Sequence, residues 1–238
     1  MRNYIRLPLK NAYNARDLGG YACSDGVTSF RRFVRADGLE CLDEEDIAFL
    51  KTYGITTVID LRSGDELALR PDAPALAEFA DCINIPLIAG DGLDLSKFAA
   101  VAPDSFLTKY YLDILKESQE ALVTVIETIA SAPEGGVLFH CAAGKDRTGI
   151  IAVLLLGLVG VSVPDIISNY EITYTLIREN PDLPSQRADD PIEYWHSGRE
   201  SLEPALTYIH AFGGISEYLK QIGVSPQSLE RVRKRLIA

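Results

Sequence analysis

The chain has 238 residues, of which 34 are acidic and 23 basic, so its formal net charge is −11. Hydrophobic residues make up 47% of it and charged residues 24%, which is ordinary for a soluble globular protein and excludes a disordered, collagen-like or disulfide-stapled chain. The acidic balance argues against a protein that coats nucleic acid or anionic membrane. An anionic small substrate would need a local cluster of cations and hydrogen-bond donors.

Neither the cysteines nor the start of the chain points to export. The four cysteines form no C-x-x-C pair, and three histidines are too few for a zinc module. Scattered cysteines are typical of a reducing compartment, and residues 1–10 contain no long apolar stretch, so we expect a cytoplasmic protein without a signal peptide. The longest uncharged run, 148–164, falls short of the roughly 20 apolar residues of a membrane span and predicts a buried core helix.

Helical and strand patterns alternate along the first part of the chain. Residues 14–26, rich in Gly, Asn and Asp, predict turns. Residues 42–54 predict an amphipathic helix with acids in its first turn and Gly54 as its C-terminal stop. The β-branched run 55–61 predicts a buried strand, and 82–86 predicts a short one.

The same alternation continues through the middle of the chain. Residues 105–132 predict two helices with a break near 117–120. A strand over 136–140 follows, and then the apolar helix, which begins near Thr148. Strands alternating with helices indicate an α/β fold with a mainly parallel central sheet flanked by helices.

The last part of the chain is predicted to be mostly helical. Ser162 caps a helix that runs to about residue 179. Residues 180–198 contain three prolines and predict a long irregular segment, a candidate lid or flap. Residues 203–238 predict further helices separated by glycines. We predict one domain over residues 1–238.

The most informative residues are the ten from His140 to Gly149, HCAAGKDRTG. Open parallel sheets bind ligands where a strand ends and a helix begins, as here. Cys141 and Arg147 bracket five residues, enough chain to curl around one tetrahedral oxyanion with backbone N–H groups pointing inward, and the helix N-terminus adds partial positive charge. Small loop residues let the backbone approach the ligand: Ala142, Ala143 and Gly144, of which the last can take a positive φ.

The residue types in this loop predict nucleophilic catalysis. A cysteine at a helix N-terminus beside Lys145 and Arg147 is favoured as a thiolate, which makes Cys141 a ready nucleophile. The planar fork of Arg147 can hold two phosphoryl oxygens, and with the loop amides it can stabilise charge in the transition state. Thr148 could donate a hydrogen bond to the sulfur, and His140 could orient the loop.

The leaving oxygen needs a proton, and three aspartates are candidates for supplying it. Asp146 lies inside the loop and is the first candidate. Asp60 ends the strand over 55–61 and would share an edge of the sheet with the loop, although it could instead pair with Arg62. Asp104 precedes a helix, where it could simply be a cap.

Several other features have a less specific interpretation. Arg31, Arg32 and Arg35, like the basic tail 231–235, predict solvated surface, with the alternative that the first group lies at the rim of the site. Four tyrosines are expected at core or half-buried helix positions rather than as ligand clamps: Tyr110, Tyr111, Tyr170 and Tyr174. Trp195 and His196 are candidates for lining a substrate cleft.

At these residues the sequence resembles the cysteine-dependent protein tyrosine phosphatases, most of all the atypical bacterial branch of the mycobacterial PtpB and listerial LipA type. The loop His140–Gly149 matches that branch. Further matches are Asn14–Gly20 (NARDLGG), Arg35–Asp37, Ile59–Ser63 (IDLRS) followed by Glu66, and Gly214–Leu219.

The resemblance implies a PTP-like fold and a phosphocysteine intermediate on Cys141, with phosphate bound by Arg147. Asp146 is implied as the acid because this branch lacks the usual Trp-Pro-Asp loop, as this chain does. Lys145 is associated with activity on phosphoinositides as well as phosphotyrosine. Ala36 stands where the branch has Ser, and the 180–198 segment is too short for a large double-helical lid.

We therefore expect a metal-independent phosphatase without a cofactor, acting on a phosphorylated protein or a phosphoinositide. Phosphate or another oxyanion would bind in the loop, at Ala142, Ala143, Gly144, Lys145, Asp146 and Arg147. One alternative is a sulfurtransferase or arsenate reductase that uses the same kind of anion loop. Another is a phosphate-binding module without catalysis. Turnover of para-nitrophenyl phosphate, compared with thiosulfate, distinguishes these functions.

Overall fold

The computed structural model describes residues 5–88, 103–181 and 197–237. The main sheet has the spatial strand order β1 (Arg16–Asp17), β4 (Phe33–Ala36), β7 (Gly136–His140), β5 (Ile55–Asp60) and β6 (Asp81–Asn84). Strands β4, β7, β5 and β6 run parallel, and β1 pairs with β4 in the antiparallel sense. A separate hairpin is formed by β2 (Ala22–Cys23) and β3 (Gly26–Val27). The predicted α/β fold with a mainly parallel sheet is confirmed.

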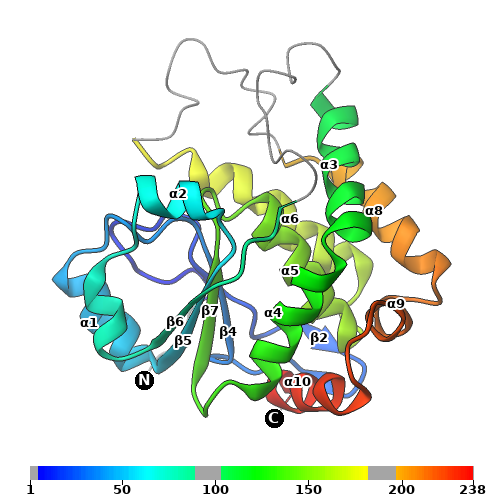
Figure 1. The fold of residues 1–238 in the computed structure, drawn as a ribbon, viewed down its shortest axis with the longest axis horizontal. Coiled ribbons are helices and arrows are strands. Elements are labelled where there is room, and N and C mark those ends of the chain that lie inside the picture. The colour runs from blue at the N-terminus through cyan, green and yellow to red at the C-terminus, as the bar shows by residue number, and fades with distance from the viewer. Residues whose placement is uncertain (1–4, 89–102, 182–196, 238) are drawn as a thin grey trace.

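Helices cover both faces of the main sheet (Figure 1). One face carries α1 (Glu44–Tyr53) and the 3₁₀ turn η1 (Pro74–Glu78), with α2 (Gly64–Leu69) above the sheet edge. The helices of the other face are α3 (Pro103–Glu117), α4 (Gln119–Ser131), α5 (Asp146–Leu158), α6 (Val163–Ile177), α8 (Arg199–Ala211), α9 (Ile215–Ile222) and α10 (Pro226–Ile237).

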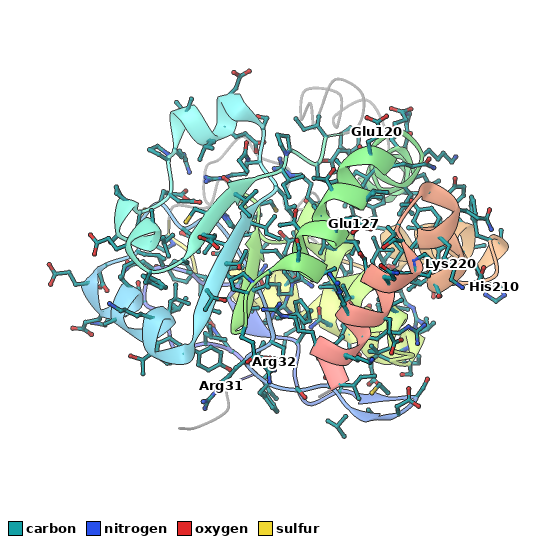
Figure 2. All side chains as sticks on the ribbon, turned by 60° about the horizontal axis from the view of Figure 1, so that its bottom comes forward. Arg31, Arg32, Glu120, Glu127, His210 and Lys220 are labelled. Atoms are coloured by element: carbon teal, nitrogen blue, oxygen red, sulfur yellow. The ribbon has the colours of Figure 1, made fainter. Side chains whose placement is uncertain are left out.

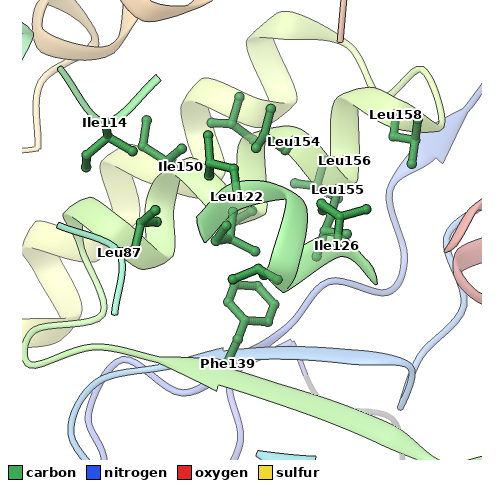
Figure 3. Packing of buried hydrophobic residues seen from close by; sticks show 14 of the residues in the cluster. Leu87, Ile114, Leu122, Ile126, Phe139, Ile150, Leu154, Leu155, Leu156 and Leu158 are labelled. Atoms are coloured by element: carbon green, nitrogen blue, oxygen red, sulfur yellow. The ribbon is translucent and has the colours of Figure 1, made fainter. Parts of the chain in front are cut away.

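The side chains of β7 alternate between two apolar clusters. Val137 and Phe139 join the cluster built by α3–α6 and α8–α10, whereas Leu138 joins the cluster under α1. In Figure 3 the ring of Phe139 points from the strand toward Leu122 of α4. This two-sided burial is typical of a parallel sheet and explains why the strand is apolar at consecutive positions.

Helix α5 is the predicted core helix. Every residue of it except Gly157 is buried. It begins at Asp146, two residues before the expected start near Thr148. In the described part of the chain no helix is long and apolar enough to cross a membrane.

Three of the predicted helix boundaries agree with the structure. Gly54 ends α1 with φ 95°, Ser118 separates α3 from α4, and the Ser162 hydroxyl accepts a hydrogen bond from the amide of Asp165 at the start of α6. Residues 182–196, which include Trp195, His196 and most of the candidate lid, lie outside the described residues.

The predictions missed strand β4 and misplaced the arginines around it. Arg35 is fully buried, so its interpretation as solvated surface was wrong. Because Phe33 pairs with Val137 and Ala36 with His140, Arg31 and Arg32 lie at the amino end of the sheet, opposite the loop after His140. Figure 2 shows these two arginines together at that end. They therefore do not form a rim of the site.

The C-terminal helix α10 is fastened to the rest of the chain by polar contacts at two places. Glu127 of α4 faces α10 (Figure 2) and accepts hydrogen bonds from the Ser225 amide (3.0 Å) and the Ser228 hydroxyl (2.5 Å). Arg235 donates to the carbonyls of Ala132, Pro133 and Gly135 at 2.6–2.9 Å. The second contact holds the turn that leads from α4 into β7.

We predict that Arg235→Ala destabilises the protein by about 2 kcal/mol, because it leaves carbonyls without charge-assisted hydrogen bonds. For a chain of this size the thermal midpoint should fall by roughly 4–8 °C, measured by circular dichroism. The matched control is Lys234→Ala, since the Lys234 side chain is 76% exposed and forms a surface ion pair with Glu230. Equal midpoints for the two variants would contradict the assignment.

Candidate active site

The loop after β7 lies where three parallel strands end. Ala36 of β4 and Asp60 of β5 both pair with His140, so the residues that follow these strands meet at one edge of the sheet. Cys141 is the first residue of the loop, 3% exposed, and α5 begins five residues later at Asp146. Cys141 therefore precedes the amino end of a buried helix by one short loop, and such a helix end favours negative charge.

Gly144 is the residue on which the shape of the loop depends. Its φ is +64°, in the left-handed region. A Cβ built at this position would lie 2.5 Å from the Ala36 oxygen and 2.7 Å from the Asp37 nitrogen, both backbone atoms that cannot give way. Both observations require glycine here, as the sequence predicted for the turn.

Arg35 lies beneath the loop with its guanidinium fully buried. It donates to the Gly144 carbonyl (2.6 Å) and to the Asn169 side-chain oxygen (2.7 Å). Burial lowers the pKa of Arg35 to about 10, and the charge of Cys141 acts in the opposite direction. Arg35 therefore stays protonated at neutral pH and adds a cation below the sulfur.

Arg147, in the first turn of α5, is held by Glu66 of α2. The two carboxylate oxygens of Glu66 accept from Nη1 (2.6 Å) and Nη2 (2.7 Å) of Arg147. Ser63 and Glu66 also form a capping box at the start of α2, so the position of Glu66 is fixed by its own helix. Although burial would lower the pKa of Arg147, the hydrogen bonds that it donates to Glu66 and the charge of Cys141 raise it.

Asp146 and Lys145 are buried neighbours at the end of the loop. The Tyr111 hydroxyl donates to Oδ1 of Asp146 (2.6 Å) and lies 2.5 Å from the hydroxyl of Tyr170. Burial and then the charge of Asp146 raise the pKa of Tyr111 well above its usual value, so the hydroxyl remains a donor. The Lys145 ammonium lies 3.6 Å from the same Oδ1, and burial lowers the pKa of Lys145. Tyr111 and Tyr170 are core residues, as predicted, but their hydroxyls reach the site.

Asp60 forms an ion pair with Arg62, which is the structural role that the sequence analysis gave as the alternative to a catalytic one. The Arg62 side chain donates to both oxygens of Asp60 at 2.9–3.1 Å and to Asp72 at 2.6 Å. Nε2 of His140 lies 3.0 Å from Asp72, and Nδ1 lies 3.4 Å from the Cys141 carbonyl oxygen. By spacing, Asp60, Asp72 and His140 could surround a metal ion, but the guanidinium of Arg62 already contacts both carboxylates.

Thr148 and Asp104 are the two remaining candidates for a catalytic role. Thr148 is fully buried, and within the described residues its hydroxyl has no hydrogen-bond partner. Its place in the first turn of α5 is compatible with a bond to sulfur. Asp104 lies inside the first turn of α3 rather than before it. Nothing about its side chain is described.

Comparison with known proteins defines the family. A model described as "Tyrosine phosphatase family" matches residues 7–238. A "Tyrosine-protein phosphatase" of Nostoc commune is 37% identical over 228 residues, which cover 90% of this chain and 77% of that protein. "Triple specificity protein phosphatase PtpB" of Mycobacterium tuberculosis is 27% identical over 289 residues, covering 96% and 98%. The solved structure of P. aeruginosa TpbA covers 80% of this chain and 86% of its own at 17% identity, and its TM-score of 0.37 carries no weight.

The chain therefore belongs to the tyrosine phosphatase family, a class of phosphoric monoester hydrolases, as the loop from His140 to Gly149 predicted. Sequence reasoning gave no chemical role to Glu66 or Asn14, although both lie in the motifs that carried the resemblance. It also missed the burial of Arg35. The apolar flanks of that residue, Phe33-Val34 and Ala36, were the available signal for a buried strand.

The pair between Glu66 and Arg147 predicts a defined pH dependence of stability. These contacts lower the pKa of Glu66 to about 2, against the opposing effect of burial. The folded value lies below the usual 4.5, so the stabilisation is complete above pH 4.5 and disappears as the pH falls through 2. Because the Glu66 side chain is 38% exposed, solvent screens the pair, and we expect it to contribute about 1 kcal/mol to the free energy of unfolding. This corresponds to roughly 2–4 °C in the thermal midpoint.

We therefore expect Glu66→Gln to lower the thermal midpoint by a constant amount between pH 7 and pH 5, and by less below pH 4.5. Asp65→Asn is the control, since this neighbouring acid is exposed in the same helical turn. A midpoint difference that stays unchanged down to pH 2 would disprove the paired state of Glu66.

Proposed function

We propose that this protein hydrolyses phosphomonoesters, phosphotyrosine among them, without a metal ion and through a phosphocysteine intermediate on Cys141. The observation that carries the proposal is the burial of three cations in or against the loop that begins with Cys141: Arg35, which bonds the Gly144 carbonyl, and Lys145 and Arg147, at the start of α5. Such surroundings favour a thiolate and, next to it, a phosphate. Three buried cations would have no evident role beside a cysteine that only fills space in the apolar core.

In the first step the Cys141 thiolate attacks phosphorus in line, a sulfur–phosphorus bond forms, and the bond to the leaving oxygen breaks. Glu66 occupies one N–H of each terminal nitrogen of Arg147, and a guanidinium has five N–H donors. Three donors thus remain for equatorial phosphoryl oxygens. The amides of the loop supply further donors as charge develops on these oxygens.

Asp146 supplies the proton to the leaving oxygen in this mechanism. The Tyr111 hydroxyl donates to Oδ1 of Asp146, and we assign the transferred proton to Oδ2. Asp60 is less suited, because Arg62 donates to both of its oxygens. Asp104 remains an alternative without described contacts.

In the second step water attacks phosphorus, the sulfur–phosphorus bond breaks, and Asp146 accepts the proton of the water. The thiolate is then the leaving group. The buried Thr148 hydroxyl, which lacks a partner within the described residues, is our candidate for donating a hydrogen bond to it. His140 would hold the loop through its contact with the Cys141 carbonyl.

The finer substrate range is also part of the proposal. One relative is named a triple specificity phosphatase, which supports a substrate range wider than phosphotyrosine. We extend the proposal to phosphoserine and phosphothreonine. Lys145, the residue that the family resemblance connects with phosphoinositides, lies in the loop next to Asp146. We propose a phosphorylated protein or a phosphoinositide as the substrate, in the cytoplasm, and a single catalytic domain over residues 1–238.

We expect Cys141→Ser to abolish turnover of para-nitrophenyl phosphate while inorganic phosphate still binds. The nucleophile is lost, but the cations and the loop amides stay in place. Turnover is measured by absorbance and phosphate binding by calorimetry. Full residual activity would refute the phosphocysteine mechanism. Sulfur transfer from thiosulfate by the wild type, without phosphate release, would favour the sulfurtransferase, and tight phosphopeptide binding without turnover would favour the binding module.

We expect Asp146→Asn to lower kcat far more for phenyl phosphate than for para-nitrophenyl phosphate. The nitrophenolate leaves without protonation, whereas the phenolate needs a general acid, whose contribution is typically 10²–10⁴-fold, taken as an order-of-magnitude estimate. The fall in rate on the high-pH side of the profile should also flatten. The matched variant is Asp60→Asn. If that variant, and not Asp146→Asn, shows the dependence on the leaving group, Asp60 is the acid.

A further inference from the structure

Asn14, in the segment before β1, binds the back of the phosphate loop. Its side chain is fully buried, and its amide nitrogen donates to the carbonyl oxygens of both Ala143 and Gly144, each at 3.0 Å. These contacts join residues that are about 130 positions apart in the chain. The reaction described above gives Asn14 no role.

The neighbouring carbonyls of the loop are bound from outside in the same way. The Gly38 amide donates to the Ala142 carbonyl (2.9 Å). Nη2 of Arg35 donates to the carbonyl of Gly144 (2.6 Å) and, at 3.4 Å, to that of Lys145. All four consecutive carbonyls from 142 to 145 therefore accept hydrogen bonds from donors outside the loop.

This arrangement fixes the direction of the loop amides. In a trans peptide the C=O and the following N–H lie in one plane and point in opposite directions. Carbonyls that are held outward therefore turn the next N–H groups inward, toward the space an oxyanion would fill. Within the described residues, the amides of Ala143 and Gly144 donate no hydrogen bond. They are free to bind a ligand.

The residues that hold the carbonyls are themselves fixed by other partners. Both oxygens of Asp37 accept backbone N–H groups, from Tyr13 and Asn14, at 2.9 Å. The side-chain oxygen of Asn169 accepts from Arg35 at 2.7 Å, and its carbonyl accepts from Arg16 at 2.8 Å. Asn14 and Arg35 thus have little freedom to follow a displaced loop.

The same two residues also leave polar atoms unsatisfied. Within the described residues, Oδ1 of Asn14 and Nε of Arg35 are buried without a hydrogen-bond partner. Such atoms reduce stability, and an apolar residue of similar size would avoid the cost. Their presence indicates that Asn14 and Arg35 serve the loop rather than the stability of the fold.

We propose that Asn14 and Arg35 are positioning residues that hold the phosphate loop in its anion-binding shape before a ligand arrives. The inference rests on the proposed function, since it assigns the loop to phosphate. Neither side chain needs to touch the substrate. Their effect is that the loop amides need not be reordered when phosphate binds, which increases affinity.

The test compares Asn14→Ala and Arg35→Lys with the wild type. Lysine keeps the positive charge of Arg35 but, with one nitrogen, cannot bond the Gly144 carbonyl and Asn169 in the same fork geometry. We expect the Kd for inorganic phosphate, measured by calorimetry on folded protein, to rise roughly tenfold in each variant, the effect of about 1.4 kcal/mol. The kcat/KM for para-nitrophenyl phosphate should fall by at least the same factor.

Asn11→Ala is the matched control. Asn11 lies in the same segment and donates to Asp46 rather than to the loop (2.9 Å), so its loss costs a hydrogen bond without touching a loop carbonyl. We expect its phosphate affinity to equal that of the wild type. Thermal midpoints of all variants show whether a variant has lost its fold or only its affinity for phosphate. If Asn14→Ala does not fold, the affinity of Arg35→Lys tests the inference by itself.

The possible failures are distinguishable. Wild-type affinity and kcat/KM in folded Asn14→Ala and Arg35→Lys would overturn this inference and leave the proposed function intact. An equal loss of affinity in Asn11→Ala would also overturn it, since the effect would then be a general loosening of the segment. A wild-type protein that neither binds phosphate nor hydrolyses the ester would refute the proposed function itself.

Discussion

The burial of three cations at one loop is the constraint on which the site depends, because Arg35, Lys145 and Arg147 are all buried in or against the loop that begins with Cys141. Two of these cations have carboxylate partners, since Arg147 is paired with Glu66 and Lys145 lies near Asp146. Arg35 is bonded to carbonyl and amide oxygens, which carry no full charge. In the mechanism that we propose, a thiolate at Cys141 supplies the negative charge that Arg35 lacks. The chain has a net charge of −11, so in the proposed function these few buried groups, and not the protein as a whole, would attract phosphate.

The parallel sheet brings these groups together because its strands end at one edge. Cys141 follows β7, and Arg35 lies in β4. Asp37, which accepts a hydrogen bond from the Asn14 amide, comes directly after β4. Strand β5 leads to α2, the helix that carries Glu66. Each of these groups is thus positioned by backbone pairing that is independent of the ligand. Apolar clusters pack against both faces of that framework. Hydrogen bonds from Asn14 and Arg35 to the loop carbonyls tie the loop to it.

The sequence predicted what local pattern and residue type determine. The strand before Cys141, the buried helix after it and the glycine of the turn all follow from nearby residues, and the family follows from the same loop. Arg35 was misjudged because a charged residue in a four-residue strand looks like surface until its partners are known. The partners of Glu66 and Asn14 lie 81 and about 130 positions away, so no periodicity could indicate them. The pairing of Asp60 with Arg62 was weighed because the two residues are close in sequence.

The most direct measurement is to stop the reaction of the wild type with a phosphomonoester in a denaturant during turnover and to map the phosphorylated peptide by mass spectrometry. The account predicts a phosphoryl group on Cys141, absent when inorganic phosphate replaces the ester at low concentration and absent in Cys141→Ser. A phosphoryl group on another residue would contradict the account. So would steady turnover with no phosphorylated peptide, provided that the same procedure detects phosphocysteine in a control sample.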